Sequence, residues 1–143
     1  MIDSKAPFSA TAVDDSARTV TRTPLRLLLV DDHANTLQAL SHILKRDGHT
    51  VVSATTVKEA LAAAAANTFD LIISDLGLPD GSGVDLMKQL RAKHQLQGIA
   101  LTGYGAEEDV VRTREAGFTT HLTKPVSVVA LRRAIASFTP IPR

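Results

Sequence analysis

The chain has 143 residues, a formal net charge of +1 and 44% apolar residues. This length suits one domain with a real core, and the balanced charge excludes a general electrostatic attraction to nucleic acid or to an anionic membrane. The sequence has no cysteine, which excludes disulfides, thiolate metal sites and cysteine nucleophiles and fits a cytoplasmic location.

Residues 1–23 are rich in Ser, Thr, Ala and Asp and show no apolar period, so we expect a flexible tail or linker there. They contain no continuous apolar stretch like that of a signal peptide, and no apolar run in the chain approaches the roughly 20 residues of a membrane span. We expect one domain over residues 24–139 and a short C-terminal tail over residues 140–143.

Five short apolar segments alternate with longer segments of helical spacing from residue 25 onward. The predicted strands are 25–30, 50–54, 71–74, 98–102 and 119–123. Apolar residues recur on one helical face between them, as Leu37 and Leu40 do in the first helix. Gly48 stands just past that helix, and Gly117 is expected to end a weaker helix over 106–116.

The starts of three predicted helices carry residues that accept hydrogen bonds from free backbone N–H groups. Thr56, with Glu59 three residues later, is typical of a capping box. Ser82 and Ser127 are the expected N-caps of the third and fifth helices. This alternation of strands and helices predicts a parallel α/β sheet covered on both faces, because right-handed crossovers put the helices outside the sheet.

Polar residues follow four of the predicted strands, at the carboxyl ends where function collects in open parallel sheets. The strand ends read Asp31-Asp32, Asp75, Thr102 and Thr123-Lys124-Pro125. Three carboxylates that meet in space repel one another and need a neutralising charge, which Lys124 and a hard cation such as Mg²⁺ can supply. The sequence has no Cys and shows no His at ligand spacing, so zinc is disfavoured.

These residue types fit phosphoryl transfer to a carboxylate. An aspartate can act as the nucleophile and become an aspartyl phosphate, in a reaction that needs mainly positioning and charge stabilisation. A metal ion and a lysine can hold separate phosphoryl oxygens, and a threonine hydroxyl can hold another.

The strings LLLVDD, IISDLGLPDGSG, ALTG and LTKP, in this order over residues 25–138, resemble the receiver domain of bacterial two-component response regulators. The resemblance implies a flavodoxin-like, doubly wound fold with strand order 2-1-3-4-5. It also implies phosphorylation by a histidine kinase or a histidine phosphotransfer protein. Such a domain is not an enzyme with a turnover substrate, and at most it removes its own phosphoryl group.

Carried onto this sequence, the resemblance makes Asp75 the phosphoacceptor. Asp32 would be a direct Mg²⁺ ligand, and Asp31 would hold the metal mainly through water. Asp75 itself and the backbone carbonyl of Gly77 would complete the protein ligands.

The resemblance also implies residues that respond to the phosphoryl group. Thr102 would be the switch hydroxyl. In the Lys124-Pro125 pair, the lysine would bond a phosphoryl oxygen and the peptide bond would be cis. The second switch position holds His121, where many members of the family carry Tyr or Phe. Gly77 and Tyr104 occupy positions that tune the lifetime of the phosphate, and we expect the Tyr104 ring to shield it.

Three other functions compete with this one. A nucleotide-binding enzyme is disfavoured because no G-x-G-x-x-G follows the first strand and no P-loop is present. A hydrolase with an aspartate nucleophile usually carries D-x-D, whereas this chain reads Asp31-Asp32-His33. A phosphorylation-independent interaction module with the same fold stays open as the alternative. Surface or packing roles are expected for the histidines His33, His42, His49 and His94.

The expected output is a change in a protein-binding surface on the fourth helix, fifth strand and fifth helix, at 106–117, 119–123 and 127–138. Direct binding to nucleic acid or to a membrane is not expected. The residues of these motifs resemble those in the receiver domains of hybrid sensor kinases. A free single-domain regulator and a part of a hybrid kinase therefore both remain open.

Overall fold

The apolar run at the start of the domain becomes the interior strand β2 (Arg26–Val30), because its side chains can be buried on both faces of a sheet. In the computed structural model, which describes residues 23–103 and 110–141, this strand alternates between two cores. Leu28 and Val30 belong to one core and Leu27 and Leu29 to the other, and all four side chains are fully buried.

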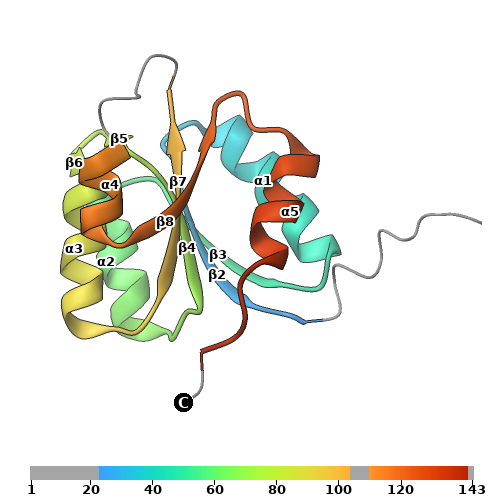
Figure 1. Cartoon of the computed structure of the whole chain (residues 1–143), viewed down its shortest axis with the longest axis horizontal. Helices are drawn as coiled ribbons and strands as arrows, with labels where there is room; N and C mark the ends of the chain where they lie inside the picture. Colours follow the sequence, from blue (N-terminus) through green and yellow to red (C-terminus); the bar gives the residue numbers. More distant parts are fainter. Residues whose placement is uncertain (1–22, 104–109, 142–143) are drawn as a thin grey trace, which may run out of the picture.

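Five parallel strands form the central sheet in the order β3-β2-β4-β7-β8 (Figure 1). The strands besides β2 are β3 (Thr50–Ala54), β4 (Leu71–Asp75), β7 (Gln97–Thr102) and β8 (Phe118–Thr123). Counted along the chain among these five strands, the order is 2-1-3-4-5, and the predicted flavodoxin-like topology is confirmed.

The described helices cover both faces of the sheet (Figure 1). On the face of Leu27 and Leu29 lie α1 (Ala34–Arg46) and α5 (Val128–Ala136). On the face of Leu28 and Val30 lie α2 (Val57–Ala66), α3 (Gly83–Lys93) and α4 (Val110–Ala116). The sheet is therefore doubly wound, as the alternating pattern predicts.

Side-chain caps start three of these helices, as the sequence predicts. Ser82 Oγ accepts a hydrogen bond from the Val84 N–H at 3.0 Å, and Ser127 Oγ accepts one from the Ala130 N–H at 3.2 Å. Thr56 Oγ1 accepts one from the Glu59 N–H at 3.0 Å. The second half of the predicted capping box is wrong. The Glu59 carboxylate accepts from the N–H of Thr55 at 2.7 Å and from its hydroxyl at 2.8 Å, because Thr55 offers two donors to one oxygen.

The predicted ends of the first and fourth helices are both glycines with positive φ. Gly48 has φ of 100° and Gly117 has φ of 122°, in a region that L-residues rarely adopt. The start of the predicted helix over 106–116 lies outside the described residues, which resume with Val110. Most of the expected N-terminal tail, residues 1–22, also lies outside them.

A short hairpin follows β4. Its antiparallel strands are β5 (Gly77–Leu78) and β6 (Gly81–Ser82), too short to show an alternating pattern in the sequence. Asp80, between them, accepts the backbone N–H groups of Val57 at 2.7 Å and Lys58 at 3.0 Å. The loop after β4 is thereby tied to the N-terminus of α2.

The C-terminal end packs beside the start of β4. Asp70 is 1% exposed and accepts the backbone N–H groups of Arg26 at 2.8 Å and Ile141 at 2.9 Å. The Ile141 side chain also packs against an apolar core, so packed structure continues past residue 139, the expected end of the domain. No helix within residues 23–103 and 110–141 is long and apolar enough to cross a membrane.

His49 is one of the histidines expected on the surface or in packing roles, and it is buried just before β3. The Leu25 N–H donates to His49 Nδ1 at 3.0 Å, so this nitrogen carries no proton. Burial lowers the pKa of His49, although the nearby Asp47 carboxylate acts in the opposite direction. The folded chain therefore takes up this proton less readily than the unfolded chain does.

We expect this histidine to lower the free energy of unfolding as the pH falls below about 6.5, the ordinary histidine pKa. The contribution of His49 to the free energy of unfolding is fully present above that pH, because the imidazole is then neutral in both the folded and the unfolded chain. His49→Asn keeps an acceptor near the position of Nδ1 and removes the titration. Urea unfolding between about pH 7.5 and pH 5.5 should show a smaller loss in this variant than in wild type or in the exposed control His42→Asn. Equal losses in wild type and His49→Asn would contradict the prediction.

Candidate functional site

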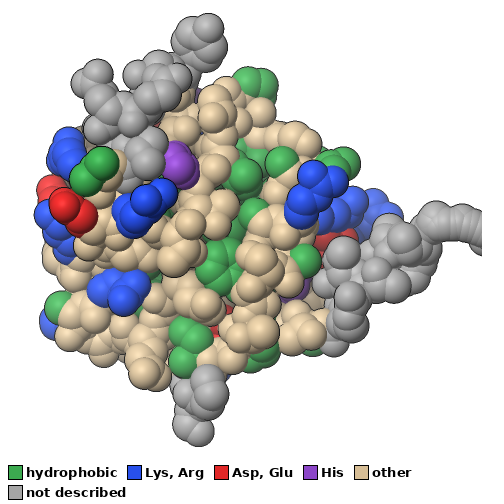
Figure 2. Space-filling model, viewed as in Figure 1, with side chains coloured by type: hydrophobic (Ala, Val, Ile, Leu, Met, Phe, Trp, Pro, Cys, Tyr) green, Lys and Arg blue, Asp and Glu red, His purple; other side chains and the backbone are tan. Residues whose placement is uncertain are grey.

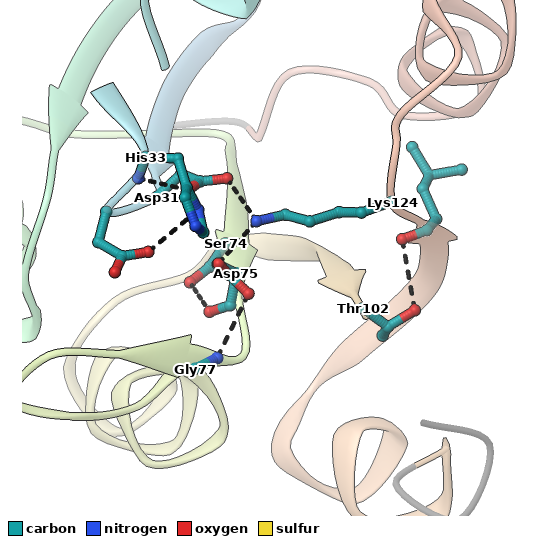
Figure 3. A network of polar contacts seen from close by, with 9 residues as sticks. Asp31, His33, Ser74, Asp75, Gly77, Thr102 and Lys124 are labelled. Atoms are coloured by element: carbon teal, nitrogen blue, oxygen red, sulfur yellow. Dashed lines mark hydrogen bonds and ion pairs between the residues drawn. The ribbon is translucent and has the colours of Figure 1, made fainter. Parts of the chain in front are cut away.

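The polar side chains that follow four strands lie at one edge of the sheet (Figure 3). The parallel register brings the strand ends together, with the pairs Val30 and Ser74, Asp75 and Leu101, and Thr102 and Thr123. Asp31, Asp75 and Lys124 are in direct contact there, and the sequence prediction that these groups converge is confirmed.

Lys124 reaches between two carboxylates (Figure 3). Its Nζ atom lies 2.9 Å from Asp31 Oδ2 and donates a hydrogen bond to Asp75 Oδ2 at 2.8 Å. The peptide bond to Pro125 is cis, as expected, and the Lys124 N–H donates to the Thr102 carbonyl at 2.8 Å. Burial acts to lower the pKa of Lys124, but the bonds and charges of Asp75 and Asp31 outweigh it and raise the pKa. The ammonium group is therefore charged.

Asp31 is completely buried just past the end of β2. Its Oδ1 atom accepts the His33 backbone N–H at 2.9 Å. Within the described chain, its Oδ2 atom accepts no hydrogen bond of good geometry and faces only the Lys124 ammonium. Burial acts to raise the pKa of Asp31, but the hydrogen bonds from His33 and the adjacent Lys124 ammonium outweigh it and lower the pKa. The buried group is thus held as a carboxylate.

His33 lies in the carboxylate cluster, and the sequence prediction that no histidine stands at ligand spacing is wrong. Its Nδ1 atom is 3.0 Å from Asp31 Oδ1 and 3.3 Å from Asp32 Oδ1. The signal was present in the string Asp31-Asp32-His33. Because the chain turns from β2 into α1 at these residues, a side chain two positions after Asp31 folds back onto it.

Asp31, Asp32, His33 and Asp75 each offer one ligand atom, and these atoms lie within 4.8 Å of one another. Oxygen-rich groups of this kind suit Mg²⁺, and the negative charge of three carboxylates exceeds what one lysine neutralises. The buried Asp31 Oδ2, which accepts no hydrogen bond of good geometry in the described chain, has a lone pair free for a cation. The donor set therefore fits a divalent ion.

The other predicted site residues are Thr102, His121, Gly77 and Tyr104. The Thr102 side chain is buried, and its hydroxyl points to the Leu122 carbonyl at 3.5 Å, on the side of β8 (Figure 3). His121 is exposed on β8. The Gly77 N–H donates to Asp75 Oδ1 at 3.3 Å, which places that glycine beside the cluster. Tyr104 lies outside the described residues.

A family model for the response regulator receiver domain matches residues 27–136. The chain belongs to this family. This receiver domain is 36% identical over 124 residues to the KDP operon transcriptional regulatory protein KdpE of Escherichia coli, covering 81% of the chain and 55% of KdpE. It is 33% identical over 142 residues to the virulence sensor protein BvgS of Bordetella pertussis, covering 94% of the chain and 11% of BvgS. The similarity thus concerns one part of each longer relative.

Among solved structures, the receiver domain resembles that of the Saccharomyces cerevisiae response regulator Ssk1, determined together with the histidine phosphotransfer signaling protein Ypd1. The TM-score is 0.75 at 25% sequence identity, over 81% of this chain and 89% of the other. The resemblance stated from the motifs is therefore confirmed at the level of family and fold.

Proposed function

We propose that this receiver domain accepts a phosphoryl group on Asp75, with Mg²⁺ held by the neighbouring carboxylates, and takes part in two-component signalling. The observation that carries the proposal is the position of Lys124 Nζ between Asp31 Oδ2 and Asp75 Oδ2. This position of Lys124 places one positive charge beside the Asp75 nucleophile. The Asp31 carboxylate, on the other side of the ammonium group, is available to help hold a cation. Positive charge of this kind stabilises phosphoryl transfer.

In the proposed reaction, an Asp75 oxygen attacks the phosphorus of a phosphohistidine. The new oxygen–phosphorus bond forms as the phosphorus–nitrogen bond breaks, and the electron pair of that bond returns to the donor imidazole. A Mg²⁺ ion held by the neighbouring carboxylates would supply positive charge for the phosphoryl oxygens. The Lys124 ammonium, which now donates to Asp75 Oδ2 at 2.8 Å, transfers this bond to a phosphoryl oxygen.

The roles of the other site residues follow the same proposal. Asp32 and the Gly77 carbonyl would hold the ion, together with Asp31, which would act mainly through water. The Thr102 hydroxyl turns from the Leu122 carbonyl toward the phosphoryl group, since its present bond of 3.5 Å is long and weak. His121 is the second switch residue.

The lifetime of the phosphorylated state is set by the flanking residues Gly77 and Tyr104 in this proposal. A Cβ added at Gly77 would meet nothing within 4 Å, so the space beside this glycine is open. The Tyr104 ring is proposed to shield the phosphoryl group, and Tyr104→Ala is proposed to shorten the lifetime. The domain is a phosphoacceptor and not an enzyme with a turnover substrate.

The proposed phosphoryl donor is a cytoplasmic histidine kinase or a histidine phosphotransfer protein, and the Ssk1 complex with Ypd1 supports a donor of the second kind. Similarity to part of the virulence sensor protein BvgS supports the alternative in which this receiver domain is one part of a hybrid sensor kinase. The proposed output surface is formed by α4, β8 and α5. Phosphorylation is proposed to shift the equilibrium between conformations of this surface.

A protein is the proposed partner of that surface. On the face shown in Figure 2, lysine and arginine side chains form separate groups toward α3–α4 and toward α5, without a continuous basic stripe among the described residues. Proteins that bind nucleic acid or anionic lipid directly usually present such a stripe or patch.

The test is phosphorylation by acetyl phosphate, measured by intact mass. Wild type should gain the mass of one phosphoryl group in the presence of Mg²⁺ and none after chelation of the metal. Asp75→Asn, which keeps the size of the side chain, should gain nothing. If wild type fails to gain mass both with acetyl phosphate and with a phosphorylated histidine phosphotransfer protein, the phosphorylation-independent interaction module replaces this proposal.

A further inference from the structure

In the cluster of Asp31, Asp32, His33 and Asp75, His33 is the residue that has no role in the proposed phosphoryl transfer. Its side chain is 66% exposed, yet Nδ1 is turned inward to the carboxylates of Asp31 and Asp32. His33 occupies the N-cap position of α1, but its side chain makes no capping hydrogen bond. Helix capping therefore does not explain this orientation.

The distances around His33 suit a hydrogen bond to Asp31 Oδ1, and they also match those between ligands of one metal ion. Two ligands bound cis to a six-coordinate ion at about 2.1 Å are about 3 Å apart. His33 Nδ1 lies 3.0 Å from Asp31 Oδ1 and 3.3 Å from Asp32 Oδ1. The imidazole nitrogen is thus at ligand–ligand spacing from Asp32 Oδ1, the carboxylate oxygen proposed to bind the ion directly.

The site is also prepared for an ion by its buried member. Asp31 is completely buried, and the His33 backbone N–H fixes its Oδ1 at 2.9 Å. Its Oδ2 accepts no hydrogen bond of good geometry from the described residues. The exposed His33 ring can adjust toward an ion without loss of packing, whereas the carboxylate of Asp31 is held in place.

An imidazole ligand changes which ion such a site prefers. Mg²⁺ favours an all-oxygen set and keeps several waters, so it gains little from a nitrogen donor. Imidazole suits later first-row ions, whose affinity for nitrogen sites rises from Mn²⁺ through Co²⁺ to Ni²⁺.

We propose that His33 is a metal ligand of this site and that it raises the affinity for later first-row divalent ions, such as Co²⁺ and Ni²⁺, while leaving Mg²⁺ affinity almost unchanged. The inference rests on the proposed function, because the same carboxylates hold the ion that assists phosphorylation of Asp75. His33 thereby sets which ions compete with Mg²⁺ at the phosphorylation site.

The test is isothermal titration calorimetry of the full chain with Mg²⁺, Co²⁺ and Ni²⁺, at about pH 8 where an ordinary imidazole is neutral. His33→Ala should weaken Co²⁺ and Ni²⁺ binding by about tenfold or more and Mg²⁺ binding by less than about threefold, since metal-site partners typically change affinity by 10–100-fold. The visible absorption bands of bound Co²⁺ should shift in the same variant, because a nitrogen ligand is lost.

His42→Ala is the matched control, since His42 is an exposed histidine of the same helix. It should bind all three ions as wild type does. Equal weakening of Mg²⁺ and Co²⁺ in His33→Ala, no weakening of either, or an unchanged Co²⁺ spectrum would each overturn the assignment. Thermal unfolding of His33→Ala confirms that the variant is folded.

Phosphorylation by acetyl phosphate with Mg²⁺ separates this inference from the proposed function. If wild type and His33→Ala are both phosphorylated and bind Co²⁺ equally well, only the role of His33 is overturned. If wild type neither binds Mg²⁺ nor gains a phosphoryl group, the proposed function and this inference are overturned together.

Discussion

Lys124→Met is expected to lower the free energy of unfolding by about 1–3 kcal/mol in metal-free buffer. The substitution keeps the aliphatic chain but leaves the carboxylates of Asp31 and Asp75 side by side without their shared cation. The loss is smaller than for a fully buried pair, because the side chains of Lys124 and Asp75 are 22% and 12% exposed and water screens them.

Mg²⁺ should restore much of this stability, since a divalent ion neutralises the same carboxylates. The gain in melting temperature on addition of Mg²⁺ should therefore be larger in Lys124→Met than in wild type. Thermal unfolding with Mg²⁺ and with a chelator measures both effects. Lys88→Met, at an exposed position of α3, is the control and should respond as wild type does. An equal Mg²⁺ response in Lys124→Met and wild type would show that the lysine and the ion act at separate places.

Gly83→Ala is expected to lower the free energy of unfolding by about 3 kcal/mol or more, and to reduce phosphorylation of Asp75. A Cβ at this first residue of α3 would collide with the backbone carbonyl oxygen of Asp75 and lie 3.0 Å from Leu76 Cα. These are backbone atoms, which cannot move aside as the end of a flexible side chain does. The strand end that carries Asp75 must shift instead.

Gly77→Ala is the matched control for stability, because a Cβ there meets nothing within 4 Å. Its free energy of unfolding should stay within about 0.5 kcal/mol of wild type. Urea unfolding and intact mass after reaction with acetyl phosphate measure the two expected losses in Gly83→Ala. Wild-type stability of Gly83→Ala would show that α3 moves easily relative to β4.

The sequence predicts the sheet well because the apolar pattern of each strand matches the burial of its side chains in the fold. The run in β2 is apolar at every position after Arg26, and both of its faces are covered, so its pattern has one interpretation. Ser82 and Ser127 cap helices as predicted, since N-cap preference depends on neighbouring residues alone. Convergence of Asp31 and Asp75 follows from parallel pairing of their strands.

The features that the sequence did not reveal depend on which of several similar hydrogen-bond partners a side chain or backbone group contacts in the folded chain. Glu59 bonds to Thr55 because that residue offers two donors, and a motif of fixed spacing does not register this choice. Ile141 packs through a backbone N–H bond to Asp70, 71 positions earlier, which no local pattern encodes. The predicted surface or packing role of His33 misses its place in the carboxylate cluster, because its side-chain direction depends on the turn between β2 and α1.

The bond between Asp80 and α2 makes part of that helix a spectroscopic reporter on the phosphorylation loop. The amide protons of Val57 and Lys58 point at the Asp80 carboxylate, which lies five residues after Asp75 and on the same loop. Amide chemical shifts respond strongly to the length of such bonds, so these two resonances register any movement of the loop that carries the hairpin β5–β6. They belong to residues outside the metal cluster, so a paramagnetic ion bound there broadens them less than it broadens the resonances of its own ligands.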